Sequence, residues 1–282
     1  MKKILIPALL ILLSLPVYSL ETGITTEFGN YGLSDYSSSS TEYIPYFQWA
    51  AEIFYHDKSE SNDNLQYGFV LGRDTIKGYS LAAELKFVQP YYSISFGPVF
   101  GIINESYTLV KPGFSGKLRG EWPGRLFMEI GGDMIPAQYA GAENDYSNYS
   151  SYYTFGFYLK QNHILCYFTQ QLDNYAALSG SNPYTDSLVS YIFYTIFFEK
   201  RSIFKIETKM GYEILNRTFQ DTSDIELRNI LFGLRTDFFV KPGVSVFIGL
   251  DNKIYPVSRG SIELNDVPLY QITVESGFRW SK

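Results

Sequence analysis

Cysteine and histidine are almost absent from this sequence. Among its 282 residues, Cys166 is the single cysteine, and His56 and His163 are the two histidines. One cysteine cannot form an internal disulfide, so a disulfide-stabilised secreted scaffold is excluded. Two separated histidines with one cysteine do not supply a transition-metal site, and neither histidine lies in a pattern typical of a general base. We therefore expect no cofactor and no enzymatic activity.

Long apolar runs and blocks of basic residues are also missing. Beyond residue 19 no apolar run approaches the length of a transmembrane helix, and no helical period lasts beyond a turn or two. The formal net charge is −6, without a lysine or arginine block, which argues against nucleic acid as a partner. If this chain enters a membrane, it has to do so as strands.

The N-terminus has the pattern of a secretory signal peptide. Lys2 and Lys3 precede an apolar run from Ile4 to Leu15, and Val17 and Ser19 are small residues at the positions of a cleavage site. A single anchor helix is the alternative, but this run is short for a bilayer. We expect residues 1–19 to be a signal peptide and residues 20–282 to form one domain.

Two features are abundant in this sequence: aromatic residues, and stretches in which apolar and polar residues alternate as they do in strands. The chain has 25 tyrosines and 22 phenylalanines, more than a core of this size requires. Apolar and polar residues alternate in stretches of about the length that a tilted membrane strand needs, roughly 9 to 11 residues. These stretches are residues 20–28, 47–55, 65–72, 79–87, 92–100, 114–122, 126–134, 153–159, 164–170, 188–198, 204–214, 230–240, 244–254 and 270–280.

The links between these stretches alternate between short and long. Short links occur at 89–90, 122–125, 161–162, 200–201 and 241–243, whereas long polar links cover 31–42, 103–111, 136–150, 173–187, 215–224 and 256–267. Short turns on one side and long loops on the other are typical of transmembrane β-barrels. The predicted fold is therefore all-β: an antiparallel up-and-down barrel of about 14 strands, or of 12 if the glycine-rich hairpin at 114–135 is not formed.

The charged residues lie almost entirely on one parity of these strands. A lysine or arginine that faces lipid at the midplane costs about 2 to 4 kcal/mol, so only the polar-inward parity suits a barrel. This parity predicts pore-lining candidates, which are Glu84, Lys86, Lys117, Arg119, Glu121, Glu129, Lys205, Glu207, Lys209, Arg235, Asp237, Asp251, Glu275 and Arg279. Fourteen strands leave room for water around them. A barrel filled by salt bridges, without flow, is the alternative.

A secreted soluble sandwich would also alternate. Strand length, the asymmetry of the links and the large aromatic residues at strand ends argue against it, because such aromatics suit the two membrane interfaces.

The closing stretch "ITVESGFRW" resembles the last strand of bacterial outer-membrane proteins, which alternates toward a terminal Phe or Trp read by the barrel-assembly machinery. Here Ser281 and Lys282 follow Trp280, which departs from that pattern. In size and pattern the chain is similar to the fourteen-stranded monomeric porins. The resemblance implies a monomeric outer-membrane channel for passive diffusion of small hydrophilic solutes, with outer-membrane lipid and the assembly machinery as partners.

Two other functions stay open at this stage. Links such as "AGAENDYSNYSSY" and "DNYAALSGSNPYTDS" mix tyrosine with serine and asparagine, which favours a surface barrel that acts as an adhesin or receptor. Uptake of hydrophobic compounds ranks last, because transporters of that class carry an N-terminal hatch domain that we do not expect here.

Overall fold

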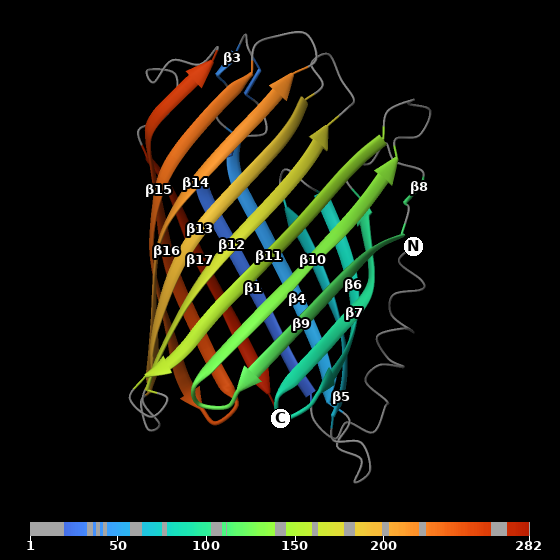
Figure 1. Cartoon of the computed structure of the whole chain (residues 1–282), viewed down its shortest axis with the longest axis vertical. Coiled ribbons are helices and arrows are strands. Elements are labelled where there is room, and N and C mark those ends of the chain that lie inside the picture. Colours follow the sequence, from blue (N-terminus) through green and yellow to red (C-terminus); the bar gives the residue numbers. More distant parts are fainter. Residues whose placement is uncertain are drawn as a thin grey trace.

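The chain forms a closed antiparallel β-barrel of fourteen strands in this computed structural model (Figure 1). The structure describes residues 20–32, 36–37, 40–41, 44–56, 64–74, 78–102, 109–110, 112–138, 145–159, 163–177, 184–198, 203–219, 224–260 and 270–281. The predicted signal peptide, residues 1–19, lies outside this part of the chain. No helix among the described residues is long and apolar enough to cross a bilayer.

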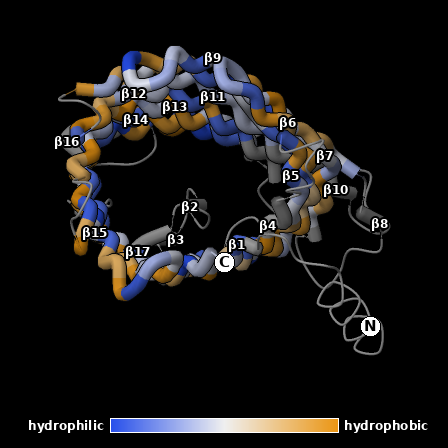
Figure 2. Tube along the Cα trace, turned by 90° about the horizontal axis from the view of Figure 1, so that it is seen from below, coloured by the Kyte–Doolittle hydropathy of each residue, from blue (hydrophilic) through white to orange (hydrophobic). Residues whose placement is uncertain are grey.

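Each barrel strand pairs with the next along the chain, and the last pairs with the first (Figure 2). The strands are β1 (Leu20–Gly32), β4 (Ile44–His56), β5 (Leu65–Asp74), β6 (Gly78–Val88), β7 (Tyr92–Ile102), β9 (Pro112–Trp122), β10 (Leu126–Gln138), β11 (Asp145–Leu159), β12 (Ile164–Ala177), β13 (Tyr184–Phe198), β14 (Phe204–Phe219), β15 (Ile225–Lys241), β16 (Val244–Gly260) and β17 (Tyr270–Ser281). Three short segments add to this: β8 (Leu109–Val110) pairs with β10, and β2 (Tyr36–Ser37) pairs with β3 (Ser40–Thr41).

The glycine-rich hairpin, on which the predicted strand count depended, is present. β9 and β10 pair from Leu126 opposite Trp122 to Met134 opposite Phe114, and they complete fourteen strands rather than twelve. A tight turn joins them, with Gly124 at φ 70° and a hydrogen bond from Arg125 N to the Trp122 carbonyl oxygen. The predicted fold class is confirmed.

Several strands are longer than predicted. The expected links 136–150 and 173–187 are largely strand, because β11 begins at Asp145, β12 extends to Ala177 and β13 begins at Tyr184. β14, β15 and β16 have 16, 17 and 17 residues. Beyond the hydrocarbon zone a strand keeps its backbone hydrogen bonds without needing apolar side chains, so a hydrophobic pattern underestimates its length.

The two faces of the sheet differ as predicted. One face exposes large apolar side chains, and at neighbouring positions of β15, β16 and β17 the exposed fractions of Leu234, Leu250 and Val274 are 52%, 51% and 39%. The other face carries the charges. Several of its ion pairs join strands that are separated by one intervening strand. Side chains converge on the concave side of a closed sheet and diverge on the convex side, so only on the concave side can they reach each other over this distance. The charged face is therefore the inner wall.

Candidate functional site

The inner wall formed by β14, β15 and β17 carries a continuous chain of opposite charges. Lys205 Nζ lies 2.5 Å from Asp237 Oδ2, and the other oxygen of Asp237 accepts a hydrogen bond of 2.9 Å from Arg235 Nε. Arg235 Nη1 in turn lies 3.0 Å from Glu275 Oε1. Four of the predicted inward residues thus form one network. Charge-assisted hydrogen bonds of this kind fix long side chains in one orientation.

Two further ion pairs lie on the same wall. Lys209 pairs with Asp251 from β14 to β16, and Lys253 Nζ lies 2.8 Å from Glu213 Oε2 between the same two strands. Glu213 also accepts hydrogen bonds from Asn229 Nδ2 at 3.0 Å and from Ser190 Oγ at 3.4 Å. With 4% of its surface exposed, Glu213 is the most deeply buried carboxylate of this wall, and it depends on these partners.

Glycines lie between the partners of two of these ion pairs, Lys209–Asp251 and Arg235–Glu275. In the register, Lys209, Gly233 and Asp251 are consecutive across β14, β15 and β16, and Arg235, Gly249 and Glu275 are consecutive across β15, β16 and β17. A Cβ at Gly233 would lie 2.2 Å from Asp251 Oδ1 and 2.5 Å from Lys209 Cε. The missing side chain of Gly233 therefore lets the Lys209–Asp251 pair lie flat along the wall instead of pointing across the lumen, whereas a Cβ at Gly249 would leave more room for the Arg235–Glu275 pair.

Substituting Gly233 with alanine is expected to displace the Lys209–Asp251 pair toward the lumen and to lower single-channel conductance. Because a partly solvated ion pair contributes at most about 1 kcal/mol, the variant should still fold. Gly249→Ala is the matched control, since its Cβ would approach no atom closer than 3.3 Å. The measurement is unitary conductance in planar bilayers. Equal conductance for both variants and the wild type would contradict this role of Gly233.

A second network covers the inner wall at β9, β10 and β11. Arg119 Nη2 lies 2.9 Å from Glu121 Oε2, and Arg119 Nη1 lies 3.6 Å from Glu129 Oε2. Tyr158 donates to Glu121 Oε1 at 3.2 Å, and Tyr152 donates to Glu129 Oε1 at 2.9 Å. Arg119 is the centre of this network, and its two carboxylates are each held a second time by a tyrosine.

Two phenylalanines face inward and support the arginines. The Arg119 guanidinium carbon lies 3.9 Å from the centre of the Phe127 ring, and that of Arg235 lies 3.8 Å from the centre of the Phe247 ring. Both rings are almost fully buried, at 4% and 2% exposed. Stacking of this kind stabilises a guanidinium and fixes its plane. The rings thus lie beneath the charged layer.

The remaining candidates share the inner parity but differ in their partners. Arg279 Nε lies 3.8 Å from Glu52 Oε1. Within the part of the chain that the structure describes, Glu84, Lys86, Lys117 and Glu207 have no ion-pair partner. The structure therefore brings ten of the fourteen predicted residues into ion pairs and leaves four unpaired among the described residues.

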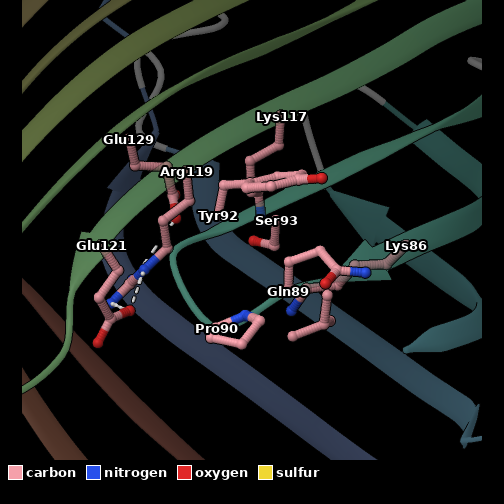
Figure 3. A pocket seen from close by; sticks show the side chains of 10 residues that line it. Lys86, Gln89, Pro90, Tyr92, Ser93, Lys117, Arg119, Glu121 and Glu129 are labelled. Carbon is pink, nitrogen blue, oxygen red and sulfur yellow. Dashed lines mark hydrogen bonds and ion pairs between the residues drawn. The ribbon is translucent and has the colours of Figure 1, made fainter. Parts of the chain in front are cut away.

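Two hollows open beside three of these residues, Glu84, Lys86 and Lys117. The first, of about 300 Å³, is lined by Lys86, Ser93, Lys117, Arg119 and Glu129, among others (Figure 3). The second, of about 240 Å³, is also lined by Lys117. Its lining also includes Glu84, Asp133 and several hydroxyl groups, which are those of Ser95, Ser115, Ser150 and Tyr152. Both hollows are lined by several charged or hydroxyl side chains and have room for water.

Sequence reasoning missed the inward aromatic residues. Strict alternation places Phe127 on the parity of Glu129, and Phe247 on the parity of Asp251. Tyr152, Tyr158, Tyr167 and Tyr194 likewise belong to the inner face, and Tyr167 stacks on Tyr194 with ring centres 4.5 Å apart. Extending the parity rule to every residue would have found them. They were missed because the aromatic residues were related only to the two membrane interfaces.

The two histidines lie at the ends of strands. His56 ends β4 and His163 lies in the turn before β12. The described residues contain no group of three or more His, Cys, Asp or Glu side chains placed to hold a metal ion.

The sequence matches no protein-family model and no curated protein. Among solved structures, a COG4313 outer-membrane channel from Pseudomonas putida F1 is similar with a TM-score of 0.55 and 8% identity, covering 95% of this chain and 97% of that one. The outer-membrane-expressed OmpT of Vibrio cholerae gives a TM-score of 0.47 and 10% identity, covering 93% of this chain and 97% of that one. The chain thus shares its barrel fold with an outer-membrane channel.

Proposed function

We propose that this chain is an outer-membrane channel for the passive diffusion of small hydrophilic solutes. The observation that carries the proposal is the arrangement of the inner wall. Its ion pairs, Lys209–Asp251 and Arg235–Glu275 among them, run along the wall over glycines and do not bridge the lumen. A fourteen-stranded barrel has an interior wider than the eight-stranded barrels that side chains fill. Charged groups facing such an interior keep water there.

The outer face supports the membrane part of the proposal. Large apolar side chains are exposed on every barrel strand from β5 to β7 and again from β13 to β17, as hydrocarbon contact requires. We further propose that the chain acts as a monomer, that it is exported by its signal peptide, and that the assembly machinery recognises β17. No catalytic step is part of this function.

The unpaired charges favour a slight preference for cations. Glu27, Glu84, Asp133 and Glu207 have no basic partner at ion-pair distance within the described residues, whereas on the inner wall the same holds for only two bases, Lys86 and Lys117. Paired charges nearly cancel at a distance, so the unpaired ones set the potential in the lumen.

Planar-bilayer recording under a salt gradient tests both statements. The purified, refolded protein is expected to give discrete conductance steps and a reversal potential of the sign that marks cation preference. Glu84→Gln combined with Glu207→Gln should reduce that preference or reverse it. Glu226→Gln is the control, because Glu226 pairs with Arg228 near the start of β15, on the opposite parity to Arg235 and Asp237. Protein that is folded by heat-modifiability on a gel but gives no steps would refute the channel.

The adhesin alternative was based on the composition of two expected links, and much of both links is strand. Most of the tyrosine, serine and asparagine residues in the two links that favoured it belong to β11, β12 and β13. Residues 139–144 and 178–183 lie outside the described part of the chain, so we put forward the channel alone.

A further inference from the structure

Lys86 and Lys117 differ from the other bases of the inner wall. Lys205, Lys209, Arg235 and Lys253 each have a carboxylate at ion-pair distance, and so does Arg119. Over the described ranges, Lys86 and Lys117 have none, although both lie on the charged parity of their strands. Their positive charges are thus available to a solute.

The register places the two lysines on either side of one small residue. Lys86 of β6 pairs with Ser95 of β7, and Ser95 pairs with Lys117 of β9. Two strand spacings separate the lysine backbones by about 10 Å. Ser95 is buried and short, so the residue that lies between the two lysines in the register adds no bulky side chain. An anion in the hollow that both lysines line can contact both.

The space beside them suits such an anion. The hollow of about 300 Å³ is lined by both lysines together with Gln89 and Ser93, which add neutral hydrogen-bond donors (Figure 3). This volume is that of about ten liquid waters, which exceeds a phosphate or carboxylate group.

The carboxylates that line the same hollow are already engaged. Glu121 lies against Arg119 and accepts from Tyr158, and Glu129 lies near Arg119 and accepts from Tyr152. Figure 3 shows Arg119 directed at Glu121, with Lys117 and Lys86 apart from that pair. The hollow is thus lined by three bases, Lys86, Lys117 and Arg119, and two carboxylates, which is a net charge of +1, and both carboxylates are held by Arg119 and not by the lysines.

We propose that Lys86 and Lys117 form an oxyanion-binding site on the inner wall, at the end of the barrel that carries the short β6–β7 turn. It takes the phosphate or carboxylate group of a permeating solute, and in this role it rests on the proposed channel function. Lysine ammonium groups bind such groups as point charges with rotatable donors. The site is compatible with an overall cation preference, because it acts on a solute within contact distance and not on the lumen as a whole.

Isothermal titration of the refolded barrel with inorganic phosphate tests the site without requiring ion flow. Binding to the wild type and a loss of affinity on the order of tenfold for each lysine removed, in Lys86→Gln and Lys117→Gln, is the expected result. Lys86→Arg and Lys117→Arg should retain binding, and Lys241→Gln, at an exposed turn outside the lumen, should leave it unchanged. A parallel titration with acetate separates a general oxyanion site, which binds both, from one restricted to phosphate.

Two results separate the site from the channel. Equal phosphate affinity in the wild type and the Lys86→Gln/Lys117→Gln double variant, both folded by heat-modifiability, would overturn the site even if conductance steps are present. Phosphate binding that depends on both lysines, in a protein without conductance, would keep the site and refute the channel. In a conducting protein, phosphate should reduce the unitary current of the wild type more than that of the double variant.

Discussion

Leu250→Arg is expected to lower the free energy of unfolding of the barrel by about 2–4 kcal/mol. Leu250 lies on the outer face of β16, six residues beyond the start of the strand at Val244, and half of its surface is exposed. Its neighbours Leu234 and Val274 are also apolar and exposed, so an arginine there would have hydrocarbon around it. The cost is that of moving a guanidinium from water into lipid.

The control uses the same strand, the same face and the same substitution at another depth. Val246 is 44% exposed and lies two residues from the β15–β16 turn, where an arginine reaches the headgroup region. Val246→Arg should cost about 0–1 kcal/mol. Denaturant titration in phospholipid vesicles, followed by the shift in gel mobility, measures both. Equal stability of the two variants would show that this face does not meet hydrocarbon.

Lys253→Met is expected to destabilise the fold by about 3 kcal/mol. Lys253 Nζ lies 2.8 Å from Glu213, a carboxylate of which 4% is exposed, and removal of the cation leaves that carboxylate with only the neutral donors Asn229 and Ser190. Breaking a buried ion pair on one side commonly costs about 3–5 kcal/mol, because an uncompensated charge remains. The lower end applies here, since part of Lys253 is solvated.

The double variant Lys253→Met/Glu213→Gln distinguishes the cost of losing the ion pair from the cost of leaving the Glu213 carboxylate without a cation. A glutamine at position 213 still accepts from Asn229 and carries no charge, so the double variant should recover most of the lost stability. Denaturant midpoints of the wild type, the two single variants and the double variant form the cycle. If the double variant is as unstable as Lys253→Met alone, the ion pair is not the cause.

Alternation made the barrel predictable from the sequence. A side chain on a strand has two choices of face, and residues such as Lys205, Glu207 and Lys209 tolerate only one of them in a membrane. A few charged residues therefore show which residues of a strand face inward. Fourteen stretches show such a division into two faces, and this predicts fourteen strands. The weakly apolar stretch from Phe114 to Met134 was predicted in the same way, because Lys117, Arg119 and Glu129 mark its inner face.

The alternation of polar and apolar residues did not predict where the strands end or which charged residues of the inner wall pair with each other. The outer half of β14 keeps its backbone hydrogen bonds although Asn216 interrupts the apolar parity. Pairing across two strands depends on register, so nothing along the sequence relates Gly233 to Lys209 and Asp251. Which lysines stay unpaired follows from the same register, and for this reason Lys86 and Lys117 were not distinguished from Lys205 or Lys209.

The unequal strand lengths give the barrel an obliquely cut mouth. β14, β15 and β16 have 16 to 17 residues, whereas β5, β6 and β7 have 10 to 11, and Figure 1 shows the long strands rising well above the short ones. With about 3.3 Å per residue and a tilt near 40°, six extra residues raise that rim by about 15 Å. Under the proposed channel function, a solute that approaches from the side of β14–β16 meets this raised wall of strands before it reaches the lumen.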